Sequence, residues 1–406
     1  MYNLGEAVGY IRLEMGKFLQ EAQQAQTSTK QIEDEFDKLG NTVKSIEGII
    51  VKSFAAIGAA VVSGLGAAVN VGSQFEASMS QVAATMGMTA EDVANGSADF
   101  EKLSAAAKEM GETTKFSASQ AADALNYLAL AGYDTEQAIS TLPTVLNLAA
   151  SGGMDLARAS DMITDAASAL GLGIDDMSLF ADKMAKAAQS SNTSVEQLGN
   201  AILQIGGTAK NLSGGVTELN TALGILANNG IKSAEGGTAL RQIILNLTAP
   251  TKKAAAYMEE LGLKVADAAG NVRPLNEIFK DLDEILQSKG ITGSADKIKA
   301  LSQIFDARQL KSANALLSNY GESWDRLYEK IDNAEGASAR MAETMETNLR
   351  GALTILGSTA EGFGITVYDS IENSFKNAVT EATKQLSNLN QAFKSDEMQA
   401  SMKKIS

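Results

Sequence analysis

The chain has 406 residues and contains no histidine and no cysteine. Zinc sites, thiolate nucleophiles, Ser-His-Asp triads and disulfide frameworks are therefore excluded, and an enzyme would have to use carboxylates, lysine or serine. The formal net charge of -15 creates a negative field that opposes binding to phosphate backbones. We accordingly expect a protein that is not an enzyme, that holds no cofactor or metal, and that recognises no specific nucleic-acid sequence.

The apolar residues indicate a predominantly all-α fold. Hydrophobic residues make up 45% of the chain but aromatic residues only 5%, so alanine, leucine, isoleucine and valine supply most of the core. Helices rich in alanine can pack closely with such side chains. Most of the 36 glycines fall between apolar periodic segments, where they can end helices.

A heptad pattern runs through residues 1–53 and predicts a long helix or coiled coil. Apolar residues recur at alternating steps of four and three residues, which is the period of a left-handed supercoil. Small or polar residues between Ala22 and Thr29 weaken the middle of this seam. Two interpretations remain open: an amphipathic helix packed on its own domain, or self-association of copies into a parallel bundle. The predicted self-association seam comprises Ile11, Met15, Phe18, Ile32, Phe36, Leu39, Val43, Ile46 and Ile50.

The next segment, residues 54–74, predicts an apolar helix rich in alanine and glycine. No charged residue occurs between Phe54 and Gly72, over about the length that crosses a bilayer. Alanine and glycine contribute little to membrane insertion, however, and small residues permit close packing of helix backbones. A buried helix is therefore the main interpretation, and transient membrane contact through Phe54–Gly72 is the alternative.

Residues 75–347 have the pattern of a multi-helix core domain. The segment KFSASQAADALNYLALAG predicts a helix that is capped by Ser117 or Ser119 and ended by Gly132. Apolar residues within it share one helical face. Similar helices follow, each bounded by glycine.

An internal repeat organises this core. The segment Leu148–Gly152 recurs as Leu226–Gly230, 78 residues later, which is twice 39, and residues 187–191 form a degenerate copy halfway between them. Such a period predicts about three stacked helical hairpins, each burying one face against the next. Apolar residues align at this spacing in two sets: Val145, Met184 and Leu223, and Ala124, Ile163 and Ile202.

One small β-hairpin is expected in this domain, near residues 263–273. Leu263 and Val265 alternate with polar residues, Gly270-Asn271 can form the turn, and Val272 begins the return. Helical patterns resume after it, and residues 348–406 predict an extended helical tail.

Motifs that could suggest chemistry have simpler explanations. Residues 206–210 and 236–238 are glycine-rich, but neither has the spacing of a phosphate loop, so we interpret both as helix punctuation. Ser294 and Lys297 have the Ser-x-x-Lys spacing of some acylating enzymes, but a serine followed by an acid is an ordinary helix start. The acidic runs 33–35 and 175–176 lack the ligand series of a cation site.

Several segments in order resemble one family. They are FEASMSQVAATMG, ALNYLALAG, LPTVLNLAASGGMDL, NTSVEQLGNAILQIG, GILANNGIKSAEGGTALR and GLKVADAAGNVRPL. Together they look like the TP901-like core region of phage tail tape-measure proteins, over about residues 70–350. Members usually continue for hundreds of residues after this core, so we interpret the chain as an amino-terminal part or a short prophage-type member.

The resemblance implies a structural role in the virion. Proteins of this family occupy the lumen of the growing tail tube, set its length, and leave ahead of the DNA at infection. The implied partners are other copies of the chain, the tail tube protein, tail assembly chaperones, and tail tip or baseplate proteins, with the tail lumen and the host cytoplasm as locations. Two alternatives remain: a helical coiled-coil protein of the signalling or adhesin type, and a tail-associated cell-wall hydrolase, which would need a paired-carboxylate cleft.

Overall fold

The computed structural model describes residues 64–394, which form a predominantly all-α fold of seventeen α-helices and one 3-10 helix without β-strands. The described residues divide into two compact units, one of residues 75–362 and a second of residues 64–74 with 363–394. The nine residues of the predicted self-association seam lie outside the described part of the chain. The division of the sequence into residues 1–53, 54–74, 75–347 and 348–406 stays a prediction.

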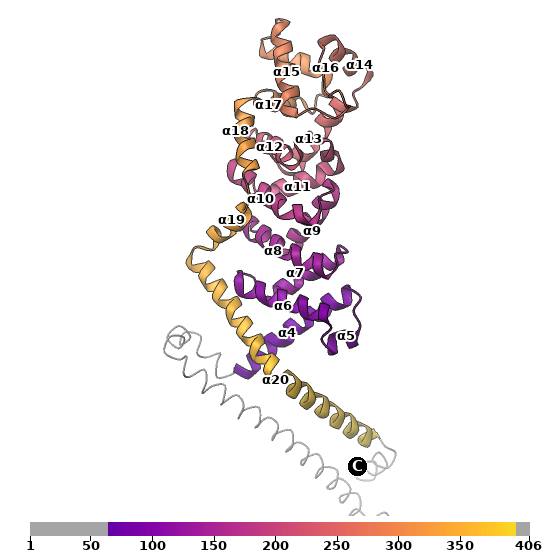
Figure 1. Cartoon of the computed structure of the whole chain (residues 1–406), viewed down its shortest axis with the longest axis vertical. Coiled ribbons are helices and arrows are strands. Elements are labelled where there is room, and N and C mark those ends of the chain that lie inside the picture. Colours follow the sequence, from indigo (N-terminus) through magenta and orange to yellow (C-terminus); the bar gives the residue numbers. More distant parts are fainter. Residues whose placement is uncertain (1–63, 395–406) are drawn as a thin grey trace, which may run out of the picture. The chain divides into compact units, whose positions relative to one another are not determined.

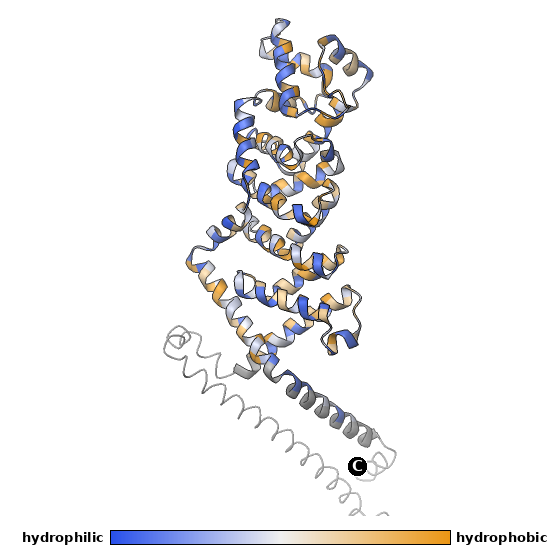
Figure 2. Cartoon of the chain, viewed as in Figure 1, coloured by the Kyte–Doolittle hydropathy of each residue, from blue (hydrophilic) through white to orange (hydrophobic). Residues whose placement is uncertain are grey.

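The larger unit is built around two rows of helices (Figure 1). After α4 (Gly64–Thr85), α5 (Ala90–Ala94) and α6 (Ala98–Thr113), the chain alternates between the rows. Each helix packs on its neighbours in the same row and on helices of the other row, and these helices carry both apolar and polar residues (Figure 2). One row contains α7 (Ala118–Leu130), α9 (Leu156–Leu170), α11 (Val195–Ile205) and α13 (Ser233–Thr248). The other row contains α8 (Thr135–Gly152), α10 (Ile174–Ser190) and α12 (Gly215–Asn228).

The predicted repeat is confirmed as this stack of helical hairpins. Successive helices of the first row begin 38 or 39 residues apart, at Ala118, Leu156, Val195 and Ser233. All six apolar residues that align at this period are buried, none more than 2% exposed. The repeat therefore arises because equivalent side chains fill equivalent layers of one continuous core.

Local capping explains where the helices of the stack begin. Ser117, not Ser119, accepts a hydrogen bond from the backbone N–H of Gln120 at the start of α7. The side-chain oxygen of Gln120 in turn accepts the backbone N–H of Ser117, which completes a capping box. Side chains also cap five neighbouring helices in the same way, each satisfying an N–H group that has no partner within its helix. These are Thr89 for α5, Ser97 for α6, Asp134 for α8, Asp155 for α9 and Ser194 for α11.

The two glycine-rich motifs have different structures. Residues 206–210 lie in the short 3-10 helix η1 (Gly206–Asn211), where Gly206 has a φ of 55° and ends α11. Residues 236–238 lie inside α13 and do not punctuate it. The expectation of helix punctuation is therefore confirmed for the first motif and wrong for the second.

The stack ends in a tip made of α14 (Lys252–Leu261), α15 (Leu275–Ser288) and α16 (Ser294–Ile304). The β-hairpin predicted before α15 does not form, since only a single bridge joins Ala266 to Val272. The turn itself was anticipated, because Gly270 has a φ of 88°. Asp267 accepts the N–H groups of Ala269 and Asn271 with its carboxylate. Side-chain hydrogen bonds thus hold a loop that is too short to form a stable two-stranded ribbon.

From the tip the chain returns along the second row of the stack (Figure 1). We call residues 310–346 the return segment; it contains α17 (Leu310–Leu317), α18 (Glu322–Asp332) and α19 (Ala337–Glu346). Helix α18 packs on α10 and α12, and α19 packs on α8 and α10. The 46-residue helix α20 (Leu349–Lys394) follows.

In the second unit, α4 and α20 come close together. A Cβ atom on Gly72 would overlap the ring of Tyr368, and Gly364 lies against Val71. Small residues therefore permit this close helix pair. Among residues 64–394, no helix combines the length and apolarity needed to cross a membrane.

Candidate functional site

Helices α15, α18 and α19 begin without a local side-chain cap. The residues that precede α18 and α19 are Gly321 and Gly336, and Pro274 precedes α15 at the tip. None of the three supplies a side-chain cap, so the first N–H groups of these helices need acceptors from elsewhere. In each case a side chain from an earlier helix provides one, and we call this arrangement a remote cap.

Asp182 of α10 is the remote cap of α19. Its carboxylate is 3% exposed and accepts three hydrogen bonds: from Gly336 N–H at 2.6 Å, from Ser338 N–H at 2.9 Å and from the Ser338 hydroxyl at 2.5 Å. The partial positive charge of a helix N-terminus stabilises such a carboxylate. Beside it, Ala185 forms a small buried cluster with Ala334 and Ala337.

Glu218 of α12 is the remote cap of α15. This 2% exposed carboxylate accepts the N–H of Leu275 at 2.5 Å and the N–H of Gly214 at 2.7 Å. Burial raises the pKa of Glu218 above its ordinary value, and the two backbone N–H groups offset part of this increase. Glu218 therefore fixes the tip to the last helix of the second row, at a cost in desolvation.

Two further contacts follow the same principle. The side-chain oxygen of Asn276 on α15 accepts the N–H of Gly321 at 2.9 Å, just before α18, and its amide group donates to Asp325 at 2.8 Å. Near the start of α20, Glu361 accepts the N–H of Ser119 in the first turn of α7 at 3.0 Å. Remote caps thus connect the tip, the return segment and α20 to helices far away in the sequence.

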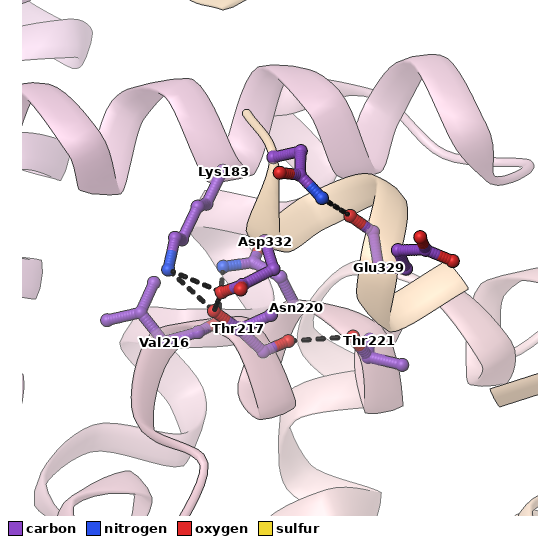
Figure 3. A network of polar contacts seen from close by, with 8 residues as sticks. Lys183, Val216, Thr217, Asn220, Thr221, Glu329 and Asp332 are labelled. Carbon is purple, nitrogen blue, oxygen red and sulfur yellow. Dashed lines mark hydrogen bonds and ion pairs between the residues drawn. The ribbon is translucent and has the colours of Figure 1, made fainter. Parts of the chain in front are cut away.

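A polar network joins α18 to both α10 and α12 (Figure 3). Lys183 donates to the hydroxyl of Thr217 at 2.6 Å and lies 3.4 Å from Asp332, whose carboxylate also accepts from Thr217 at 3.0 Å. Figure 3 shows these three side chains pointing toward one another from three helices. The last residue of α18 is therefore fixed next to the position where Asp182 caps α19.

The Ser-x-x-Lys motif forms a structural contact at the tip. Lys297 donates to Asp283 of α15 at 2.5 Å, and Asp283 also accepts from Tyr320 at 2.8 Å and Gln287 at 2.6 Å. Burial alone would raise the pKa of Asp283, but the hydrogen bonds from these three side chains outweigh it and lower the pKa. Lys297 thus serves as the counter-ion of a buried carboxylate.

These contacts hold helices together, and the oxygens of the buried carboxylates already accept hydrogen bonds within the protein. The buried carboxylates of the described residues, Asp182, Glu218 and Asp283, each accept from N–H, hydroxyl or ammonium donors. Within residues 64–394, no group of three or more acidic side chains could hold a metal ion. The acidic pair 175–176 lies in the first turn of α10, where negative charge stabilises the helix.

The remote caps are not evident from the sequence pattern. One signal was present, because Glu218 lies four residues before Ala222 and seven before Ile225, in an apolar helical stripe whose members are buried. A second signal was the absence of a capping residue before α18 and α19. Neither signal names the partner, which for Asp182 is 156 residues away.

Comparisons with known proteins find relatives among phage tail proteins. Residues 104–306, from α6 through α16, match the family of phage-related minor tail proteins. The chain is 28% identical over 384 residues to the tape measure protein of Pneumococcus phage Dp-1, covering 95% of this chain and 33% of that protein. It is 26% identical over 315 residues to the probable tape measure protein of Escherichia phage P2, covering 77% of this chain and 38% of that protein. No solved structure matches the chain.

The similarity extends over almost the whole chain but over only part of its relatives. The chain spans about a third of the length of the curated relatives that it matches. The family match includes the entire helical stack and the tip, where the repeat and the remote-capping residues Asp182, Glu218 and Asn276 are located. With half of its residues in that match, the chain belongs to the phage-related minor tail protein family.

Proposed function

We propose that the chain is a structural, non-enzymatic component of a phage tail and acts as a tape-measure protein. The observation that carries this proposal is the similarity to a tape measure protein over 384 residues, which begins and ends outside the family match and includes most of the chain. The TP901-like placement of the core, and a prophage origin, are finer parts of the same proposal.

The structure supports different roles for the helical stack and for α20. The stack of helical hairpins is a folded body whose length is determined by side-chain packing, so it cannot act as an extensible ruler. Helix α20 is a rod of 46 residues, or about 69 Å at about 1.5 Å per residue. We therefore assign length determination to rod-like segments such as α20, and assembly contacts to the folded stack.

Location and partners follow from this assignment. The chain would lie in the tail lumen, after assembly in the host cytoplasm, and would leave ahead of the DNA. Its partners would be other copies of itself, the tail tube protein, the assembly chaperones and the tip or baseplate proteins. The net charge of -15 supports passage through a tube that also carries DNA, because like charges repel.

The buried carboxylates already accept hydrogen bonds within the protein, which favours a structural role over that of a cell-wall hydrolase. A glycoside hydrolase needs two carboxyl groups free to contact the scissile bond, whereas Asp182, Glu218 and Asp283 hold helices together. Purified protein should release no fragments from peptidoglycan. Release above the level of a heat-inactivated sample would contradict the non-enzymatic proposal.

A stop codon early in the reading frame tests the structural role in the phage. The expected result is that particles with full-length tails disappear and that supplying the protein from a plasmid restores them. Electron micrographs that show normal tails without the protein would contradict the proposal.

A further inference from the structure

Helix α19 is held on the stack by polar contacts and by a few small apolar side chains. It has ten residues, of which only Ala337, Ser338 and Ala342 are buried. Small side chains bury little apolar surface, and isolated helices shorter than about 12 residues are marginal in water. The three hydrogen bonds to Asp182 are therefore a large part of what keeps α19 in place.

The break between α19 and α20 is not caused by glycine or proline within the segment that spans it. No glycine or proline occurs between Ala337 and Arg350, and most of the residues there are good helix formers. The chain nevertheless leaves the helical conformation at Thr347, where ψ is 61°, and α20 restarts at Leu349. Figure 1 shows that the two helices meet at a bend. Tertiary contacts of α19 therefore contribute to this break, together with the cap that Asn348 provides for α20.

An apolar heptad pattern continues across the bend without a change of register. Met345 and Leu349, on either side of the break, are 48% and 77% exposed. Steps of three and four residues place them in one series, as one continuous helix would require. The series consists of Ala342, Met345, Leu349, Ala352 and Leu356.

Gly351 is specific to the bent arrangement. A Cβ atom at this position would overlap the backbone carbonyl of Glu346 at the end of α19. Asn348 accepts the N–H of Gly351 at 3.0 Å and so caps the restarted helix. In a continuous helix this cap is not needed, and alanine at position 351 would be favoured over glycine.

We propose that α19 is a latch, and that residues 337–350 join α20 as one continuous helix when the contact with Asp182 opens. Opening removes the remote cap, and the helix then grows backwards from α20 because the sequence already favours it. Helix α20 becomes longer, and the return segment loses α19. This proposal can be tested independently of the tape-measure role, because helix continuity can be measured in the purified full chain.

Two glycine substitutions on the same helix test the bend. Because the chain has no cysteine, spin labels can be placed on cysteines introduced at the exposed positions Ala339 and Thr354. In a continuous helix their backbones are about 22 Å apart, at about 1.5 Å per residue. Gly351→Ala should shift the pulsed-dipolar distance distribution to a longer distance that is consistent with this value. Gly357→Ala, where a Cβ atom meets nothing within 4 Å, should leave it unchanged.

Asp182→Ala tests the latch, with Asp175→Asn on an exposed first-turn residue of α10 as the control. The amides of Gly336 and Ser338 should exchange about tenfold to a hundredfold faster in Asp182→Ala, as expected for loss of hydrogen bonds to a charged group. In the same variant Leu349 and Arg350 should exchange more slowly, because a continuous helix pairs their N–H groups with Met345 and Glu346. The control should show neither change.

Other outcomes would overturn the proposal. If Asp182→Ala or Gly351→Ala leaves residues 337–350 unprotected with a broad distance distribution, the latch opens into an unfolded segment. Unchanged distances in both variants would show that the bend does not depend on these contacts. Should Asp182→Ala fail to fold, Ser338→Ala removes only the hydroxyl contact and must produce the same shift to a smaller extent.

Discussion

Gly237 of α13 lies against the backbone of Ala201 in α11, so closely that a Cβ atom on Gly237 would overlap the Ala201 carbonyl. The two helices are consecutive members of the first row. Backbone contact of this kind requires a residue without a side chain. The glycine pair that resembled a phosphate loop in the sequence is therefore a packing feature of the stack.

Gly237→Ala should destabilise the protein by about 1–3 kcal/mol, because the added methyl group forces the two helices apart. Chemical denaturation of the purified chain measures this change. The matched control is Gly357→Ala in α20, where space is open. Relief of the helix cost of glycine should stabilise this variant by about 0.5–1 kcal/mol. Equal effects of both substitutions would contradict the close approach.

Glu218 should make stability fall as the pH rises. Its pKa in the folded protein is raised, chiefly by burial, so the folded state holds the proton more tightly than the unfolded state. Stability is then lost as the pH rises from the ordinary value of 4.5 through the raised pKa. The free energy of unfolding of the wild type, minus that of Glu218→Gln, should show this decrease when both are measured as a function of pH. Glu235→Gln, at an exposed position of α13, shows whether removing any carboxylate has the same effect.

Asp283 should have the opposite dependence on pH. Although burial opposes it, hydrogen bonds led by that from Lys297 lower the pKa of Asp283, so its stabilising effect is present above the ordinary value of 3.8 and is lost as the pH falls through the lowered pKa. Lys297→Met should cost about 2–3 kcal/mol at neutral pH, as for other hydrogen bonds to buried charges. This cost should shrink in acid, where Asp283 is protonated. A cost that does not vary with pH would contradict the pairing.

The remote cap of α18 can be compared with a local cap. Asn276→Ala removes the acceptor for Gly321, and Asp155→Ala removes the cap of α9. Each should cost about 1 kcal/mol of stability. Hydrogen exchange should separate them: loss of Asn276 increases exchange in α18, whereas loss of Asp155 increases it in α9. Increased exchange of α15 alone after Asn276→Ala would contradict remote capping.

The sequence predicted those features that depend on neighbouring residues. Ser117 was identified as a possible cap because its partner, Gln120, is three residues away. The repeat was visible because equivalent layers select similar apolar residues, as at Val145, Met184 and Leu223. The turn at Gly270 was also anticipated, but the hairpin was wrong, since turn chemistry alone does not create a strand ladder.

Features that depend on distant residues were not predicted. Nothing near Asp182 indicates that its acceptor oxygens serve Gly336 and Ser338, because packing of the return segment on the stack creates that contact. The same holds for the end of α19 at Thr347, where the local sequence favours a continuing helix. Tertiary structure overrides local preference at these points.

We propose that the rod-like segments set tail length and that the folded stack does not. Deletions and duplications of one, two and three heptads between residues 366 and 393 of α20, made in the intact phage, test it most directly by electron microscopy of the tails. Tail length should change in proportion, by about 1.5 Å for each residue removed or added, while Gly237→Ala should leave the length of assembled tails unchanged. Tails of unaltered length across the deletion series would contradict it.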